Sequence, residues 1–182
     1  ADVQKAVNPA ERVYYPVADN KEPIVAIGTD KEVDDPSIEV SFKQDATPDS
    51  EKNNVGYLAS QYMTSMITSM LNARLSELTQ SANPPFTRAY SSYGNFFVAK
   101  TKEALNLSAS SKADGIEKAL KVLLQEAERA RRFGFTESEY ARARANYLQR
   151  LESAYNEREK TKHGSYVREY VRNFLDAEPI PG

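Results

Sequence analysis

The 182-residue sequence contains no cysteine and a single histidine, His163. The absence of cysteine excludes disulfides and thiolate chemistry, and it leaves the redox compartment unassigned. Catalytic zinc sites mostly combine two or three histidines with a carboxylate or with thiolates. A lone histidine is therefore a poor basis for a zinc site. The polar surroundings at residues 160–164 predict that His163 is an exposed residue in a turn between helices.

Other catalytic signatures are also missing. The 7 glycines are scattered singly, so the sequence has no Gly-rich phosphate-binding loop, and it has no Gly-x-Ser-x-Gly nucleophile elbow. No apolar run approaches the roughly 20 residues that cross a bilayer. The first residues show no basic segment followed by an apolar stretch, so we see no signal peptide. We predict no catalytic, cofactor-binding or metal-binding residue in this chain.

The composition is that of a folded domain with no strong electrostatic preference. Apolar residues make up 40% and charged residues 27% of the chain, and the net charge is -2. These values fit one hydrophobic core and select neither nucleic acid nor an anionic membrane as a partner. One basic cluster is interleaved with glutamates, which favours a solvated, salt-bridged helix face over a nucleic-acid site. The cluster consists of Arg129, Arg131, Arg132, Arg142, Arg144 and Arg150.

Three carboxylate pairs raise the possibility of acid–base chemistry. They are Asp34 with Asp35, Glu126 with Glu128, and Glu137 with Glu139. The members of each pair are too close in sequence to flank a scissile bond from opposite sides, as a glycosidase requires. Turn chemistry and charge at helix ends explain these pairs better. The sequence also contains 11 tyrosines, several of them on predicted strands. Tyrosines can line a peptide-binding surface, but a half-buried sheet residue with a solvated hydroxyl is the favoured interpretation of any single one.

Strand-like segments occur in two groups. Residues 37–43 alternate between apolar and polar side chains and predict a half-buried strand. The other segments are rich in β-branched and aromatic residues and are separated by turn residues. They predict two sequential antiparallel strands near the start of the chain and a meander of two or three strands in its middle. These segments are residues 12–17, 24–29, 86–93, 95–101 and 104–110.

Helical periodicity marks residues 55–79 and most of the last third of the chain. Asp114 and Glu117 have capping-box spacing at the start of one helix, and Gly134 suits the position just after its end. Thr136 and Glu139 form a second capping box, which begins a helix expected to run to about residue 160. Ser165 is predicted to cap a final helix.

The order of strands, a long helix, strands and then three helices predicts an α+β fold, with an antiparallel sheet and helices packed on one of its faces. We expect a single domain over residues 1–182, with linker-like ends at residues 1–11 and 177–182. These ends suggest a domain excised from a longer, multi-domain protein.

Several ordered segments carry a family resemblance. Residues 133–144 (FGFTESEYARAR) place a glycine and a capping box between two helices, and residues 70–78 (MLNARLSEL) lie on the long helix. Residues 151–160 and 178–182 add to the set. Together they resemble the insulinase/pitrilysin-type zinc metallopeptidases, in particular a bacterial subgroup of long, multi-domain members. No single motif is specific for the family. The resemblance depends on the order of the whole set, and it extends over residues 12–182.

The resemblance implies a two-layer domain like those of mitochondrial processing peptidase. The family's catalytic domain carries His-x-x-Glu-His, which this sequence lacks, so no zinc-ligand or catalytic position transfers to it. It is similar to the domain that follows the catalytic one and helps to wall a substrate chamber. The expected partners are neighbouring domains and a peptide substrate. Zinc and peptidase activity would belong to the parent protein, and the cell envelope or periplasm would be its location. The alternative is an inactive family member acting as a stand-alone binding or assembly module.

Overall fold

The computed structural model describes residues 7–11, 13–33 and 35–180. Its sheet has three antiparallel strands in the order β1-β3-β2, namely β1 (Ser37–Asp45), β2 (Arg88–Asn95) and β3 (Lys102–Ser110). The helices are α1 (Val55–Thr79), α2 (Ile116–Phe133), α3 (Glu137–Asn156) and α4 (His163–Asp176). Short 3-10 turns at Asp49–Glu51 and Arg158–Lys160 precede α1 and α4.

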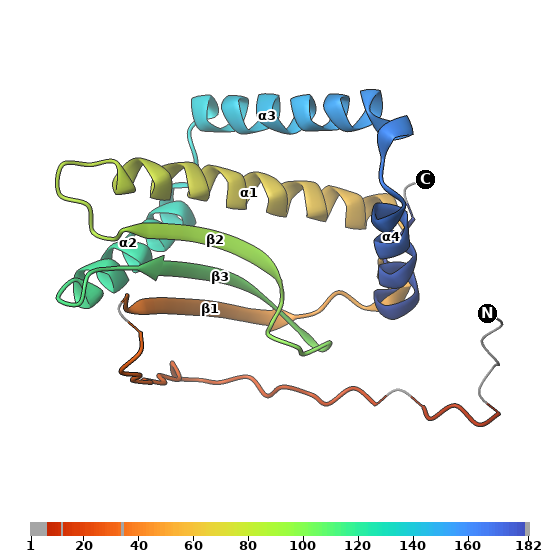
Figure 1. The fold of residues 1–182 in the computed structure, drawn as a ribbon, viewed down its shortest axis with the longest axis horizontal. Helices are drawn as coiled ribbons and strands as arrows, with labels where there is room; N and C mark the ends of the chain where they lie inside the picture. Colours follow the sequence, from red (N-terminus) through yellow and green to blue (C-terminus); the bar gives the residue numbers. More distant parts are fainter. Residues whose placement is uncertain (1–6, 12, 34, 181–182) are drawn as a thin grey trace.

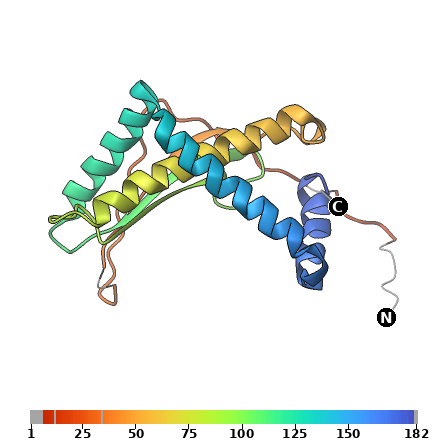
Figure 2. The same cartoon turned by 90° about the horizontal axis from the view of Figure 1, so that it is seen from above.

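The layers confirm the predicted α+β class. Helices α1 and α2 cover one face of the sheet, and α3 crosses over α1 as an outer layer (Figures 1 and 2). Helix α4 stands at one end of the molecule, close to the start of α1. Along the other face of the sheet, the described part of the N-terminal segment runs without joining it.

The main core forms where the covered face of the sheet meets α1 and α2. Leu107 on β3 lies between Val40 on β1 and Ser91 on β2, so the three residues share the covered face. Leu71, Leu75 and Leu123 from the helices pack there with Leu107 as buried residues. Apolar side chains at every second strand position and every third or fourth helix position produce this single packed layer.

A smaller cluster joins α3 to α1. Met66 and Met70 on α1 pack against the buried Ala143 of α3. The rings of Tyr62 and Tyr147 meet edge to face at 5.2 Å between centroids. The hydroxyls of Tyr62 and Tyr140 lie 3.0 Å apart and share a hydrogen bond. Helix α3 therefore packs on α1 through the first half of its own length. Beyond Tyr147, none of the described side chains of α3 is buried.

The corner between α2 and α3 matches its prediction closely. Gly134 ends α2 with φ of 66°, a backbone conformation that favours glycine. Thr136 begins α3, and its hydroxyl accepts from the Glu139 N–H while the Glu139 side chain accepts from the Thr136 N–H. This is the predicted capping box. The helix ends at Asn156, four residues before the expected 160, because the chain tightens into the Arg158–Lys160 turn.

Two predicted caps are wrong. The N-cap of α2 is Gly115, so Asp114 lies one residue too early for its side chain to reach the first turn, and no side-chain cap is present. Helix α4 begins at His163, two residues before Ser165. The Ser165 N–H donates to the Lys162 carbonyl, which places Ser165 inside the first turn rather than at the cap.

The two N-terminal strands are not found. Residues 13–17 and 24–29 belong to no strand, and Arg12 lies outside the described residues. The strand-like composition is present, with exposed Val13, Ile24 and Ile27. However, a strand also needs a partner edge for its backbone hydrogen bonds, and no described segment provides one here. The prediction of strands for these residues is therefore wrong for this chain.

The middle meander has two strands, the lower of the two numbers predicted. Residues 95–101 form no separate strand, because Asn95 already pairs with Glu103 and the intervening residues close the β2–β3 connection. Phe97 adopts φ of 52°, and the Ala99 N–H donates to the Phe96 carbonyl within the turn. The apolar side chains at the tip point into solvent, with Phe97 76% exposed. The meander thus contains two strands.

Candidate functional site

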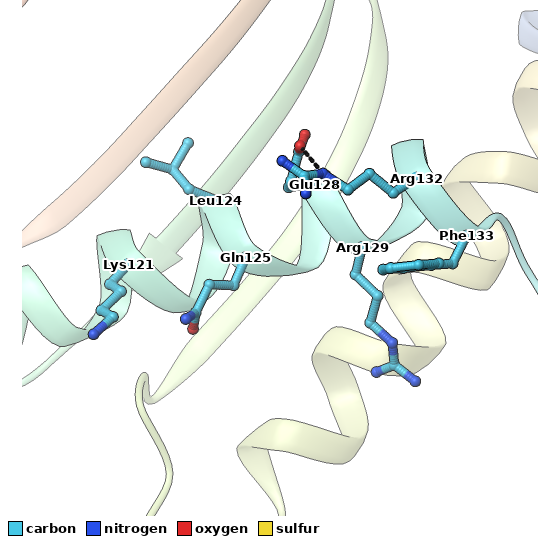
Figure 3. A pocket seen from close by; sticks show the side chains of 7 residues that line it. All are labelled: Lys121, Leu124, Gln125, Glu128, Arg129, Arg132 and Phe133. Atoms are coloured by element: carbon cyan, nitrogen blue, oxygen red, sulfur yellow. Dashed lines mark hydrogen bonds and ion pairs between the residues drawn. The ribbon is translucent and has the colours of Figure 1, made fainter.

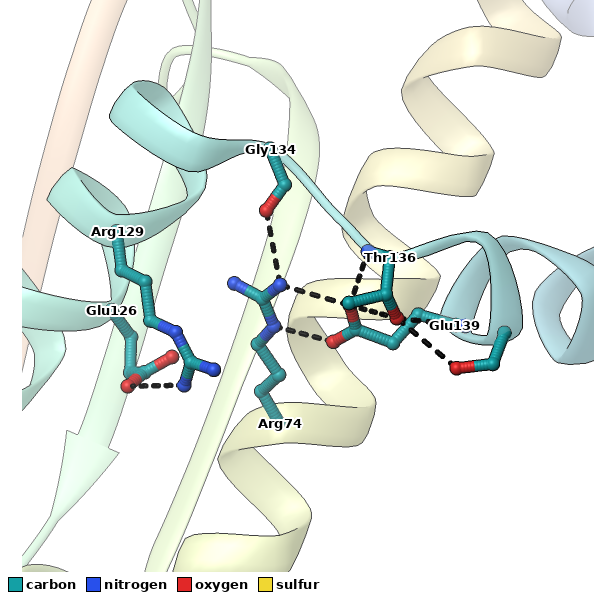
Figure 4. Close-up of polar contacts among 7 residues, drawn as sticks. Arg74, Glu126, Arg129, Gly134, Thr136 and Glu139 are labelled. Atoms are coloured by element: carbon teal, nitrogen blue, oxygen red, sulfur yellow. Dashed lines mark hydrogen bonds and ion pairs between the residues drawn. The ribbon is translucent and has the colours of Figure 1, made fainter.

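The most elaborate polar cluster surrounds Arg74 of α1 at the α2–α3 corner (Figure 4). Its Nε donates to Glu139 Oε1 over 2.5 Å, and its Nη2 donates to Glu139 Oε2 over 2.9 Å. The same Nη2 also donates to the Gly134 carbonyl over 3.0 Å. The guanidinium stacks on the Phe135 ring, 4.5 Å from its centroid. One side chain thereby fixes the end of α2, the turn and the start of α3 on α1.

The charges of this cluster stabilise each other. The hydrogen bond from Arg74 and, secondarily, the bonds from Thr136 lower the pKa of Glu139 to about 2 against the penalty of its burial. The hydrogen bond to Glu139 raises the pKa of Arg74. The two side chains are 8% and 14% exposed. Both groups therefore stay ionised at neutral pH, and neither can serve as a general acid or base there.

A second acidic group faces the same guanidinium. Arg74 Nη1 and Glu126 Oε2 are the buried side-chain atoms without a hydrogen-bond partner in the described part of the chain. The charge of Glu126 contributes to the raised pKa of Arg74. Arg129 Nη1 lies 3.5 Å from Glu126 Oε1 (Figure 4). The cluster thus combines cations and carboxylates from α1, α2 and α3, and its contacts hold these three helices together.

The exposed outer side of α2 carries half of the predicted basic cluster, namely Arg129, Arg131 and Arg132, while Arg142, Arg144 and Arg150 lie on α3. Glu128 bonds Arg131 and Arg132, three and four residues further along the helix, and its pKa is lowered to about 2 mainly by these hydrogen bonds. A shallow hollow on this side is lined by Leu124, Phe133 and the charged residues between them (Figure 3). Pairs of this spacing describe a solvated helix face, in agreement with the sequence interpretation.

The face of the sheet opposite the helices forms a second kind of surface, which we call the uncovered sheet face. Because strand side chains alternate, it bears Glu39 and Ser41 of β1, Asn106 and Ser108 of β3, and Tyr90 of β2. The Ser41 hydroxyl donates to Asn106 Oδ1 over 2.7 Å. The Tyr90 side chain is 49% exposed. Hydroxyl and amide groups next to backbone edges can contact an extended peptide without demanding a particular sequence.

One end of the uncovered sheet face is crossed by residues 15–19. Lys102 Nζ lies 2.6 Å from both Asp19 Oδ1 and Asp45 Oδ1, and these carboxylates raise the pKa of Lys102. Lys43 Nζ donates to the Ala18 carbonyl over 3.0 Å. These contacts tie the N-terminal segment to the ends of β1 and β3 and bury the Lys102 side chain, while Glu39 and Tyr90 further along the face remain exposed.

The residues weighed from sequence are not brought together. His163 is exposed and is the first residue of α4. No group of three or more His, Cys, Asp or Glu residues that could hold a metal ion occurs among residues 7–11, 13–33 and 35–180. Of the carboxylate pairs, Asp34 lies outside the described residues, and Glu139 is engaged by Arg74. No helix in the described ranges combines the length and apolarity of a membrane span.

Sequence reasoning missed two of the organising residues. Arg74 and its neighbour Asn72 belong to the segment 70–78 that carried the family resemblance, but their roles depend on contacts far away in the chain. Asn72 Nδ2 donates to the Ser91 carbonyl over 3.0 Å, and its Oδ1 accepts from the Ser91 N–H over 2.6 Å. Nothing near Lys102 in sequence signals its two carboxylate partners.

Comparison with known proteins agrees with this arrangement. The family whose sequence model matches residues 1–147 is described as "Peptidase M16 inactive domain". The chain therefore belongs to this family, the non-catalytic domains of the insulinase-type peptidases. Its three-stranded antiparallel sheet with helices on one face is the α+β fold predicted from sequence.

Particular relatives are much longer than the chain. An Arabidopsis thaliana protein described as "Zinc protease PQQL-like" is 26% identical over 181 residues, which are 100% of the chain and 16% of that protein. The periplasmic protease PqqL of Escherichia coli superposes with a TM-score of 0.73 at 18% identity, covering 84% of the chain and 16% of the protease. An insulinase-family protease from Yersinia pestis gives 0.65 at 9% identity, covering 81% of the chain and 31% of that protein.

Zinc, which the description of the Arabidopsis relative given above names, finds no suitable group of ligands among the described residues. A zinc ion in proteins is bound by imidazole, thiolate and carboxylate groups arranged around one point. The sequence has no cysteine and one histidine, and the described acidic residues form no group that could hold a metal. The residues present therefore do not fit a zinc site.

Proposed function

We propose that the chain is an accessory, non-catalytic domain of a zinc-dependent metalloendopeptidase. The observation that carries the proposal is the match to an inactive peptidase domain over residues 1–147. A "zinc protease" relative that contains the whole chain within 16% of its length supports the existence of further domains in the parent. Zinc and the bond-breaking residues would then reside in a neighbouring domain.

The role that we propose for the domain is to line the chamber that receives an unfolded peptide. The uncovered sheet face supports this role because its side chains are mostly polar, Glu39 and Tyr90 are exposed, and Glu39 and Lys43 carry opposite charges. Tyr90 offers an exposed ring that can pack against any extended chain. A surface of this kind retains a substrate weakly and without sequence selection.

Two experiments test the proposal. The 182-residue chain, incubated with zinc and an unstructured peptide, is expected to show no turnover. Zinc-dependent cleavage that disappears in His163→Ala would overturn the accessory role. In the same gene, the reading frame is expected to encode His-x-x-Glu-His within roughly one or two domain lengths. A frame without that motif would favour the inactive, stand-alone binding module instead.

The chamber role has its own test. A photoreactive phenylalanine at position 90 on the uncovered sheet face is expected to cross-link an unfolded peptide in the parent protein. The same group at position 124, on the solvated side of α2, is the matched control and should remain unlinked. Equal labelling at both positions would remove the support for a substrate-facing sheet.

A periplasmic location for the parent is proposed as well. It rests on the bacterial subgroup that the sequence resembles and on the E. coli protease, which is a periplasmic protein. Release of the parent by osmotic shock of the cells is the expected result, and retention with cytoplasmic enzymes would contradict it.

A further inference from the structure

Helix α4 is amphipathic, but its apolar side is exposed and its polar side is partly buried, which is the reverse of a helix packed on its own domain. Val167, Tyr170 and Val171 recur at helical spacing and are 57%, 59% and 46% exposed. Ser165 and Glu169, one turn apart on the other side, are half-buried. No residue of α4 is buried. A helix that packs on its own domain buries its apolar stripe and exposes its polar side. The apolar face of α4 is therefore one that the described part of the domain does not bury.

Polar contacts hold α4 in this orientation. Lys52 Nζ, just before α1, donates to the Asp176 carbonyl over 2.7 Å. Lys100 of the β2–β3 turn forms an ion pair with the Asp176 carboxylate. The Tyr166 hydroxyl donates to the Arg158 carbonyl over 3.3 Å. Both ends of the helix are thus attached to the domain, while Val167, Tyr170 and Val171 on its apolar side stay exposed.

The position of α4 in the chain indicates what covers it. The inactive-domain match ends at residue 147, so α4 lies beyond the segment that defines the family. The Arabidopsis relative nevertheless aligns over 181 residues, and those residues are 16% of its length. That relative therefore carries the region of α4 inside a polypeptide several times longer, where other domains are available to pack against it.

The charges on α4 argue against a lipid surface. Membrane-surface helices concentrate lysine and arginine on the polar side. Here Arg168 and Arg172 are accompanied by Glu169 and Asp176, and Arg172 is paired with Glu178 at 3.5 Å. Unlike Arg172, Arg168 has no carboxylate partner among the contacts described. Its guanidinium donates to the neutral Ser165 hydroxyl.

We propose that α4 docks by its apolar face onto a neighbouring domain of the same polypeptide, an inference that rests on the proposed function. The docking surface consists of Val167, Tyr170 and Val171, with Arg168 at its edge. The partner surface is an apolar groove wide enough for one helix, with a carboxylate at the rim facing Arg168. Contacts between domains of one chain commonly bury roughly 600–1,500 Å² and combine apolar and polar groups in this way.

Hydrogen exchange at α4 tests the docking. The 182-residue chain at low concentration is compared with a longer protein that includes the adjoining domains encoded by its gene. The α4 amides are expected to exchange at least about 10-fold more slowly in the longer protein, as docking closes local opening. The triple variant V167Q/Y170Q/V171Q should return them to the rate of the short chain, and Arg168→Glu should do so in part. Leu124→Gln, an exposed position of α2 with similar exposure, is the matched control and should change nothing at α4.

The outcomes separate the possibilities. Equal exchange of α4 in both proteins overturns the docking. Protection in the short chain that grows with its concentration overturns it as well, in favour of a second copy as the partner. The amides of α1 and β3 report whether the triple variant is folded; if it is not, Arg168→Glu and the comparison of the two wild-type proteins decide. A zinc-dependent peptidase assay on the same longer protein distinguishes failure of the proposed function, because loss of activity with α4 still protected leaves the docking intact.

Discussion

Arg74 and Glu139 lie 65 residues apart in the sequence and form a two-pronged ion pair, with Arg74 Nε 2.5 Å from Glu139 Oε1. The pair connects the C-terminal part of α1 with the first turn of α3. The same carboxylate closes the capping box at Thr136. One glutamate thus completes a helix start and anchors it to the rest of the domain.

Removing the cation should be strongly destabilising. Arg74→Met leaves the Glu139 carboxylate buried without its partner, and breaking a buried pair from one side costs about 3–5 kcal/mol. Denaturant unfolding measures this loss. The Arg74→Met, Glu139→Gln double variant should lose less than the sum of the single variants, with a coupling of about 1–3 kcal/mol. Arg131→Met on the solvated side of α2 is the control and should leave the denaturant midpoint close to that of the wild type. Additive losses would contradict a direct pair.

Acid should weaken the same interaction. The pKa of Glu139 is lowered to about 2 in the folded chain, whereas a free glutamate titrates near about 4.3. A carboxyl group with a depressed folded pKa stabilises the fold fully above its unfolded pKa, and this contribution is lost as the pH falls toward the folded value. The stability difference between wild type and Glu139→Gln should therefore be constant from neutral pH down to about pH 5 and shrink between about 4.3 and 2.

The measurement is thermal or denaturant unfolding of both proteins across that pH range. Glu128, whose pKa is also lowered to about 2, titrates equally in both, so its contribution cancels in the difference. A difference that persists unchanged at pH 2 would show that Glu139 acts through packing rather than through its charge.

Local patterns predicted the parts of this fold that depend on local chemistry. The capping box at Thr136, the glycine at 134 and the strand at 37–43 each need only a few neighbouring residues, and each is present. The failures at residues 13–17 and 24–29 arise because strand composition is local but the pairing edge is not. The Arg74 cluster was missed for the same reason, since its carboxylate partner lies on a different helix. The segment 70–78 was singled out by resemblance, and the structure supplies the physical role of its polar residues.

Asn72 gives that segment a second testable role. Its side-chain amide pairs with both backbone groups of Ser91 on β2, an edge strand that pairs with β3 alone among the described strands. Asn72→Ala leaves a partly buried N–H and carbonyl unsatisfied, so a loss of about 1–3 kcal/mol is expected. Asn72→Asp keeps the acceptor for the Ser91 N–H and should cost less. Asn146→Ala, on the exposed side of α3, is the control and should be neutral or slightly stabilising. Equal effects of the alanine substitutions at 72 and 146 would refute this pairing.

Two glycines offer a comparison in which the same substitution should have opposite effects. An added Cβ meets no atom within 4 Å at either Gly134 or Gly94, so steric clash is not at issue. Gly134 has φ of 66°, and Gly94 lies within β2 without a positive φ. Gly134→Ala forces an L side chain into a strained conformation and should destabilise the chain by about 1 kcal/mol or more. Gly94→Ala restricts the unfolded chain without native strain and should stabilise it by about 0.4–1 kcal/mol. Denaturant midpoints that shift in the same direction for both variants would mean that the turn at 134 does not require its left-handed backbone.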